Sequence, residues 1–263
     1  MARKTHSNKR IKKKKSLPRG EFPAQVESLT LEGRGVVHVD GKATFIGRAL
    51  PGEAVRFVYR DQRRHFDLGD AVAVERASPE RVEPGCAHFH LCGGCAMQHL
   101  APDAQVTHKQ QALLDQLARI GRVEPERLLE PLRGPIWGYR RMARLGVRYV
   151  RKKGRVLVGF REPGSPMIAD IDTCPVLDPR VGEKLPALSE MIAGLDARRD
   201  IPQIEVGCGD GHCALAFRHM VPLGEADLAR LDAFAEEHGF AVFLQPGGPE
   251  TLAPLADGPR DVY

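Results

Sequence analysis

Short stretches in which apolar and polar residues alternate fill the first third of the chain. Between residues 21 and 78 there are five of them, separated by glycines, from FPAQVESLT to DLGDAVAVERAS. Alternation with a period of two is typical of strands that bury one face. Five short strands in fewer than 60 residues favour a small closed sheet. We therefore predict an OB-like β-barrel over residues 20–78.

The pattern changes after residue 78. The segment SPERVEPGC contains two prolines and a glycine, which marks a domain boundary. Apolar residues then recur at helical spacing in three places, and alternating stretches such as RVLVGFRE and HCALAFRH lie between them. We predict a β plus α/β multi-domain protein, in which residues 79–263 form an α+β domain with a largely antiparallel sheet. The three predicted helices cover residues 102–120, 185–195 and 228–234.

One glycine-rich segment is similar in sequence to a cofactor-binding loop. IEVGCGDG, residues 204–211, is similar to the strand and loop that hold S-adenosylmethionine in Rossmann-like methyltransferases. Such a loop must lead into a helix, but the residues that follow alternate like a strand. We therefore predict a hairpin turn at Asp210 and Gly211, and we expect Cys208 and Cys213 to be buried thiols rather than nucleophiles.

Positive charge is confined to two segments. Residues 1–19 carry nine Lys and Arg and no acid, and residues 133–161 carry ten and no acid. Of the 39 basic residues, 39 − 9 − 10 = 20 remain for the rest of the chain, against all 34 acidic residues. Because an acidic body repels a polyanion, two acid-free segments favour local docking surfaces for RNA. We predict that residues 1–19 form a disordered basic arm.

The second basic segment predicts a hairpin around the tetrapeptide RKKG. On its first strand Arg140, Arg144 and Arg148 share even parity, so they face one way and the apolar residues between them face the other. A row of arginines on an acid-free strand favours contact with phosphates or bases. The residues that we expect to bind RNA are Arg140, Arg141, Arg144, Arg148, Lys152 and Lys153, with Arg48 and Arg63 in the barrel.

Three cysteines and three histidines lie close together in CAHFHLCGGCAMQHL, residues 86–100. Cys86, Cys92 and Cys95 have C-x5-C-x2-C spacing, and Cys174 in DTCPVLDP is the later cysteine in a ligand-like setting. Four thiolates satisfy either tetrahedral zinc or an iron–sulfur cubane, and spacing alone leaves both open. Gly93 and Gly94, whose N–H groups can approach sulfur, and the Cys-Pro ending favour the cubane. His88, His90 and His99 are the competing ligands, and we expect them to be bystanders.

In this order, the basic arm, the barrel, CAHFHLCGGCAMQHL, GYRRMARLGVRYV, GFRE and CPVLDP resemble the 23S rRNA uracil-C5 methyltransferases of RlmD (RumA) type, which carry a TRAM barrel. The resemblance covers essentially the whole chain. It implies a [4Fe-4S] cluster on Cys86, Cys92, Cys95 and Cys174, and 23S rRNA as the partner. It also implies S-adenosylmethionine as the methyl donor of the full-length enzyme.

The resemblance has a limit. These enzymes carry their catalytic cysteine, base and cofactor loop in a C-terminal Rossmann-like domain, and we expect that domain to be absent from this chain, which then has no catalytic residue and is inactive alone. We expect a cytoplasmic monomer, because no apolar run approaches the length of a membrane span. A different hypothesis is a non-catalytic, zinc-stabilised RNA-binding protein of ribosome assembly.

Overall fold

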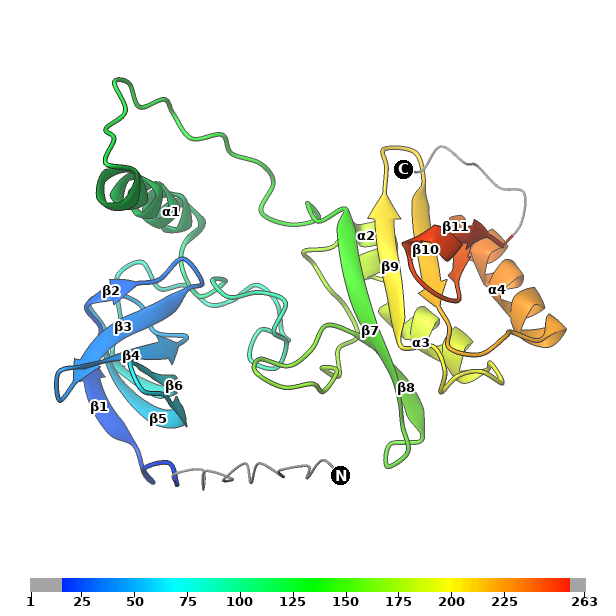
Figure 1. Cartoon of the computed structure of the whole chain (residues 1–263), viewed down its shortest axis with the longest axis horizontal. Helices are drawn as coiled ribbons and strands as arrows, with labels where there is room; N and C mark the ends of the chain where they lie inside the picture. The colour runs from blue at the N-terminus through cyan, green and yellow to red at the C-terminus, as the bar shows by residue number, and fades with distance from the viewer. Residues whose placement is uncertain (1–15, 256–263) are drawn as a thin grey trace, which may run out of the picture. The chain divides into compact units, whose positions relative to one another are not determined.

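The computed structural model describes residues 16–255, so most of the predicted basic arm lies outside the described residues. The chain forms two compact units, each with a sheet of its own (Figure 1). The first comprises the chain up to Arg81 together with residues 111–116, and the second comprises residues 82–110 and those from 117 onwards.

The first unit is a six-stranded sheet of order β1-β5-β6-β4-β3-β2, one strand more than predicted, because the first predicted stretch, FPAQVESLT, forms two strands instead of one. Most neighbours in it are antiparallel, and β4 and β6 run parallel. Its core includes Val37, Ile46 and Phe57, which alternate with exposed or half-buried neighbours. The strands are β1 (Phe22–Gln25), β2 (Ser28–Leu29), β3 (Arg34–Val39), β4 (Lys42–Gly47), β5 (Ala54–Gln62) and β6 (Asp67–Arg76).

The two edge strands of this sheet are two halves of one bent segment. Within it, the N–H of Val26 donates to the carbonyl of Glu53 beside β5, and the N–H of Glu27 donates to the carbonyl of Val36 in β3 (both 2.9 Å). Since consecutive residues pair with opposite ends of the sheet, the sheet must roll up on itself, as in an OB-like barrel. Gly35 permits this closure, because a Cβ there would lie 2.8 Å from Val26 Cγ1.

A buried ion pair joins the barrel to the chain that leaves it. The Glu53 side chain is fully buried and accepts two hydrogen bonds from Arg81, from Nε at 2.6 Å and from Nη2 at 2.8 Å. The N–H groups of Leu50 and Ser78 donate to the same carboxylate at 2.8 and 3.1 Å. The first unit therefore extends to Arg81, three residues beyond the predicted boundary.

The second unit is built on a six-stranded sheet of order β12-β11-β10-β9-β7-β8. Four of its five strand pairs are antiparallel, so the prediction of a largely antiparallel sheet is confirmed. The parallel pair, β10 with β11, is connected through helix α4 (Glu225–His238). The strands are β7 (Met142–Val150), β8 (Arg155–Gly159), β9 (Gln203–Cys208), β10 (Cys213–Arg218), β11 (Phe240–Gln245) and β12 (Ala253–Pro254).

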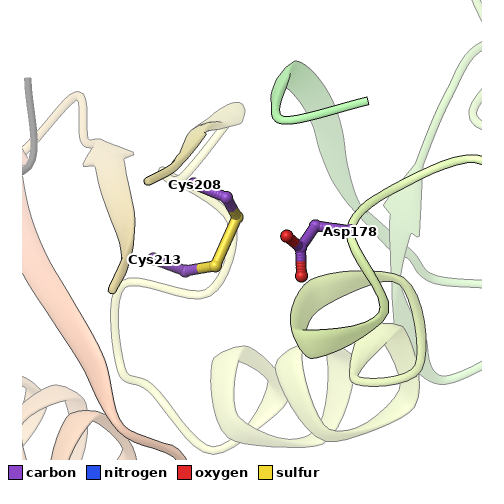
Figure 2. A group of neighbouring side chains, drawn as sticks. All are labelled: Asp178, Cys208 and Cys213. Atoms are coloured by element: carbon purple, nitrogen blue, oxygen red, sulfur yellow. A yellow bond between two sulfur atoms is a disulfide. The ribbon is translucent and has the colours of Figure 1, made fainter. Parts of the chain in front are cut away.

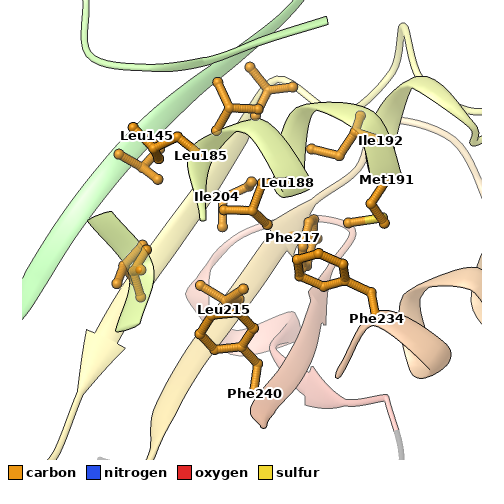
Figure 3. Packing of buried hydrophobic residues seen from close by; sticks show 14 of the residues in the cluster. Leu145, Leu185, Leu188, Met191, Ile192, Ile204, Leu215, Phe217, Phe234 and Phe240 are labelled. Carbon is orange, nitrogen blue, oxygen red and sulfur yellow. The ribbon is translucent and has the colours of Figure 1, made fainter. Parts of the chain in front are cut away.

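Helices cover one face of this sheet. In Figure 3, α3 (Leu185–Ala193) directs Leu188, Met191 and Ile192 toward the strands, and Phe234 of α4 packs beside Phe217. These side chains form one core, and burying a side chain of this size contributes roughly 1.5–3 kcal/mol. The third helical pattern is also confirmed, and α4 ends at Gly239, which has a φ of 70°.

The remaining helices are short or exposed. The predicted helix from Pro102 is confirmed as far as Gln116, but its apolar stripe is only partly packed, since Leu113 and Ile120 are exposed. Around Asp210 the predicted hairpin turn is confirmed, because β9 and β10 pair directly on either side of it. The elements not yet given are α1 (Pro102–Gln116), the π-helix η1 (Leu117–Gly121), α2 (Pro179–Gly182) and the 3-10 helix η2 (Pro249–Thr251). None of the helices in residues 16–255 has the length and apolar character needed to span a membrane.

The ion pair of Glu53 yields a stability prediction. Glu53→Ala should lower the free energy of unfolding by about 3–5 kcal/mol, because it leaves Arg81 and two N–H groups without their acceptor. Burial acts to raise the pKa of Glu53, but the hydrogen bonds from Arg81, Leu50 and Ser78 outweigh it and hold the pKa below 4.5. The carboxylate therefore stabilises the barrel above about pH 4.5, and this contribution is lost as the pH falls through the lower pKa of the folded state.

Urea unfolding of both proteins between pH 3 and 7 measures the effect. Glu32→Ala is the matched control, because Glu32 is an exposed acid of the same unit, and it should change stability by less than about 0.5 kcal/mol. Equal stability of the Glu53 and Glu32 variants at pH 7 would contradict the assignment.

Candidate metal centre and nucleic-acid interface

Four cysteines from two distant loops line one cavity. Cys86, Cys92 and Cys95 lie on the loop that opens the second unit, and Cys174 lies on the loop before α2. The first loop is folded by tight turns, in which the carbonyl of His88 accepts from the N–H of Cys92 at 2.8 Å. Counting its open mouth the cavity spans about 350 Å³, but its interior volume is only about 20 Å³, and apolar side chains such as Phe160 and Ile171 form much of its wall.

Two glycines let this loop approach its surroundings closely. The N–H of Gly94 points to Cys92 Sγ at 3.4 Å, as the sequence predicts. The prediction for Gly93 is wrong: its N–H donates to the carbonyl of Arg161 at 2.8 Å rather than to sulfur. A Cβ on Gly93 would lie 2.7 Å from that carbonyl oxygen, so a side chain does not fit there.

The spread of the sulfur atoms indicates what the cavity can hold. In the described residues, the one set of three His, Cys, Asp or Glu ligand atoms within 4.8 Å of one another is Asp178, Cys208 and Cys213. The four cavity thiols are therefore spread more widely than that. A tetrahedral zinc ion with Zn–S bonds of 2.3 Å needs sulfurs about 3.8 Å apart. Four thiols around one cavity are the ligand set of either a structural zinc ion or an iron–sulfur cubane.

Burial controls the protonation of these thiols. It raises the pKa of Cys92, against the N–H of Gly94, which lowers it. It also raises the pKa of Cys174, against the N–H groups of Leu177 and Val176. Burial therefore favours neutral thiols, and binding of a metal group would displace their protons. His88 lines the cavity too, but its Nε2 is 2.6 Å from an oxygen of Asp172.

Backbone hydrogen bonds join the Cys174 loop to the start of strand β7. The N–H of Gly138 donates to the carbonyl of Pro175 at 2.8 Å, and the N–H of Arg140 donates to that of Val176 at 3.0 Å. The carbonyl of Arg140 in turn accepts from the N–H of Asp178. The chain enters the basic strand from a position fixed beside the fourth cysteine.

Arg140 differs from its prediction. It precedes β7, its guanidinium lies 5.6 Å from the ring centre of Phe160, and it lines the cysteine cavity. It does not continue the row of Arg144 and Arg148, because its backbone pairs with Leu177 in an isolated bridge instead of with β9. The parity prediction is confirmed for Arg144 and Arg148, which are exposed while Leu145 and Val147 between them are buried.

A basic groove lies on the face of the sheet opposite the helices. It holds about 1430 Å³ of empty space, counted as before, and Gly146 forms part of its floor beneath Ile168. Arg199 lies 5.1 Å from the ring centre of Tyr149 in the same groove. No Asp or Glu is found among the described residues that line it. The arginines of the groove are Arg144, Arg148, Arg151, Arg161 and Arg199.

Three of these five arginines were not among the residues predicted to bind RNA. Arg151 and Arg161 belong to the acid-free segment, so its charge pattern could have included them. Arg199 follows α3 in an ordinary mixed-charge region, and nothing in the sequence indicates that it joins them. The Gly93–Arg161 hydrogen bond also connects this groove to the cysteine loop.

The other predicted RNA-binding residues have acidic or aromatic neighbours. Arg141 pairs with Asp210, and Lys153 Nζ lies 2.5 Å from Asp170. In the barrel, Arg48 is 3.9 Å from Asp70, and Arg63 lies 3.0 Å from Asp61 and over the Phe66 ring. Arg144 pairs with Glu205 at 2.9 Å. Lys152 is exposed in the turn between β7 and β8.

Cys208 and Cys213 are bonded to each other as a disulfide, which corrects the prediction of two free thiols. They are buried, as predicted, and they face each other across β9 and β10. Figure 2 shows the carboxylate of Asp178 turned toward the disulfide from the start of α2.

Comparison with known proteins first identifies a class. No protein-family model matches the sequence. The fold resembles the crystal structure of the Pyrococcus abyssi tRNA (uracil-54, C5)-methyltransferase in complex with S-adenosyl-L-homocysteine, with a TM-score of 0.56 and 20% identity. The match covers 85% of this chain and 50% of that one. The fold is thus one found in RNA uracil-C5 methyltransferases.

Sequence similarity narrows the class. The chain is 50% identical over 246 residues to the 23S rRNA (uracil(1939)-C(5))-methyltransferase RlmD of Alkalilimnicola ehrlichii, covering 94% of this chain and 55% of that protein. The RlmD of Nitrosococcus oceani is 52% identical over 241 residues, 91% of this chain and 54% of that protein. The chain is homologous to RlmD proteins and spans slightly more than half of their length.

One expectation from the sequence conflicts with these findings. We expected the chain to lack a Rossmann-like methyltransferase domain, yet the solved structure that covers 85% of it is that of a uracil-C5 methyltransferase. We do not maintain that expectation. The β10, α4 and β11 segments show a β-α-β unit with parallel strands inside the second sheet.

The close approach at Gly93 can be tested. Gly93→Ala should lower the free energy of unfolding by about 1–3 kcal/mol, because its Cβ would meet the Arg161 carbonyl and the Pro163 nitrogen. Thermal and urea unfolding of the whole chain measure the loss. Gly134→Ala is the control, because nothing lies within 4 Å of a Cβ there. Identical stability of the two variants would show that the loop has room to move.

Proposed function

We propose that this chain is the RNA-binding and iron–sulfur portion of an S-adenosylmethionine-dependent 23S rRNA uracil-C5 methyltransferase. The similarity of about 50% to RlmD proteins over nearly the whole chain carries the proposal. The five-arginine groove supports the binding of RNA. We assign no catalytic or cofactor-binding residue in this chain. The methyl donor and the reaction are those that the names of its relatives imply.

The groove suits an RNA backbone. Arginine side chains on a rigid strand offer planar, always charged donors to phosphate oxygens. The helices bury the other face of the sheet, so the arginine face is the one that can receive a ligand. Tyr149 lies at the edge of the groove, where its ring packs against the core and beneath Arg198 and Arg199. The arginines favour a nucleic-acid backbone, whose phosphates they can neutralise.

For the cavity we propose a [4Fe-4S] cluster held by Cys86, Cys92, Cys95 and Cys174. When bound, the cluster supplies a covalent cross-link between the two loops. Backbone hydrogen bonds join these loops to the basic hairpin. Pro175 and Val176 accept hydrogen bonds from the chain entering β7, and Arg161 accepts one from Gly93. The cysteine loops thereby fix both ends of the surface that carries the arginines.

The barrel completes the proposal. We propose that it is a TRAM domain that binds the same 23S rRNA, with Arg48 and Arg63 among its contacts. Acting on rRNA in a bacterium, the protein would work in the cytoplasm, and we expect a monomer.

Metal analysis tests the cluster. The chain purified without oxygen should contain about four iron atoms together with inorganic sulfide. It should also show a broad absorption band in the visible range. Cys174→Ser should lose most of this iron, and Cys208→Ser, whose sulfur lies outside the cavity, should keep it. Stoichiometric zinc without iron in the unaltered chain would refute the cluster.

Binding measurements test the groove. Arg148→Ala should weaken binding to a single-stranded 23S rRNA fragment by about three- to tenfold and lower the slope of log K against log salt by about 1. Arg119→Ala, in η1, is the control and should leave both quantities unchanged. Fluorescence anisotropy at several salt concentrations measures both. An equal loss in the two variants would point away from the groove.

A further inference from the structure

We propose that Cys208 and Cys213 form a reversible thiol–disulfide site that controls whether Arg141 is available to RNA. The pair exchanges with a low-molecular-weight disulfide of the glutathione class. The first part of the proposal, the site itself, is independent of the function proposed above. The second part, its effect on binding, rests on that function.

The fold itself brings the two sulfurs together. Cys208 and Cys213 are direct cross-strand partners with Cα atoms 4.1 Å apart. The next pair outward is hydrogen-bonded, since the N–H of Gly209 donates to the carbonyl of His212 at 2.8 Å. The cysteines therefore occupy a non-hydrogen-bonded position, where facing side chains approach most closely. Reduced thiols at this position remain neighbours, so the bond can form again without refolding.

The nearby carboxylate does not make this a metal site. Asp178 Oδ1 accepts from the backbone N–H of Arg180 at 3.1 Å and from its Nε at 2.9 Å, and Oδ2 accepts from its Nη2 at 2.7 Å. Both oxygens are thus engaged in capping α2 and holding Arg180. These bonds keep Asp178 ionised, and a negative charge beside the sulfurs opposes a second one there. Beside this carboxylate, a disulfide or a pair of neutral thiols is favoured over two metal-bound thiolates.

What the pair controls is the tip of the hairpin, residues 209–212. Arg180 donates to the carbonyl of Gly209 at 2.8 Å and to that of Gly211 at 3.2 Å. Asp210, at the exposed end of the tip, pairs with Arg141. The carbonyl of Arg141 accepts from the N–H of Cys208 at 2.8 Å, so Arg141, directly before β7, lies beside the end of β9 that carries the disulfide.

Two of the four residues of the tip are glycines, which permit many backbone conformations. A closed disulfide restricts these conformations. It holds Asp210 opposite Arg141 and so keeps that guanidinium occupied by a carboxylate of the same chain. Opening the bond removes one of the constraints on the tip, beside the Arg180 hydrogen bonds to Gly209 and Gly211, and so weakens the hold of Asp210 on Arg141. The expected gain is one exposed charge contact, about a two- to fivefold change in affinity.

The exchange balances with a small disulfide as the oxidant. The Cys208 thiol, whose residue is 7% exposed against 2% for Cys213, first loses its proton, and the thiolate attacks the small disulfide, forms a mixed disulfide and expels a small thiolate, which takes up a proton. The Cys213 thiol then loses its proton, and its thiolate attacks the Cys208 sulfur and expels the second small thiolate, which is protonated in turn. Two S–H bonds of the protein and one S–S bond of the oxidant are replaced by one protein S–S bond and two small thiols. An excess of the small thiol runs the same steps backwards.

Peptide mass measurement tests the site without any RNA. Trypsin releases both cysteines in one peptide, residues 200–218, because Lys and Arg are absent between Arg199 and Arg218. The folded chain is equilibrated without oxygen in glutathione buffers of different ratio, quenched with acid and alkylated. The bridged peptide should rise and fall reversibly with the ratio of glutathione disulfide to glutathione. A pair that stays reduced in pure glutathione disulfide, or bridged in excess thiol, would overturn the site.

RNA binding tests the consequence. The reduced chain should bind the single-stranded 23S rRNA fragment about two- to fivefold more tightly than the oxidised chain, while the absorption of any bound cluster is followed in parallel. Asp210→Asn should bind tightly in both states, because Arg141 is already released. Glu236→Gln, an exposed acid on α4, is the control and should keep the redox difference. The double variant Cys208→Ala/Cys213→Ala should bind with the affinity of the reduced chain. If this variant does not fold, the comparison of the oxidised and reduced unaltered chains carries the test.

The outcomes separate the two proposals. Equal affinities of oxidised and reduced chains, with the disulfide reversible by mass, would overturn the control of Arg141 while the site stands. A chain that binds no RNA in either state would refute the proposed function and leave the peptide measurement to decide the site alone.

Discussion

The convergence of Cys174 with the loop of Cys86, Cys92 and Cys95 sets the position of the rest of the second unit's working surface. The Cys174 loop accepts the backbone hydrogen bonds of the chain that enters β7, and the other loop is bonded to Arg161 just beyond β8. Both ends of the basic hairpin are therefore fixed to the two halves of one cysteine pocket. A change in how the pocket is filled would be transmitted to the arginines through backbone contacts, without a flexible side chain between them.

Alternate side chains of β7 point to opposite faces of the sheet, so one face packs the core and the other carries the arginines. Leu145 and Val147 point to α3 and the core, and Arg144 and Arg148 point to the groove. Because both sets alternate along one strand, the packing that stabilises the core also fixes the direction of the charged row. This arrangement holds Arg144 and Arg148 on a strand, so a ligand that meets them would not have to order a loop there.

Local patterns in the sequence predicted most of the fold. Period-two alternation gave the barrel strands, helical spacing gave α3 and α4, and the Asp210 turn was predicted because a strand, not a helix, follows it. The cysteine set was predicted from spacing and resemblance. The sequence could not reveal that Arg140 leaves the strand for Phe160, that Arg199 joins the groove, or that Cys208 faces Cys213, since each depends on which segments the sheet register brings together.

The bent segment at the start of the barrel has a further consequence. A sheet normally ends in two strands whose free N–H and C=O groups can pair with another chain. Here one segment supplies both ends: its first half bonds to β5 and its second half to β3. The barrel thus presents only half-strand edges, too short to recruit a neighbouring molecule. The backbone edges of the barrel therefore offer a second copy of the chain little to pair with.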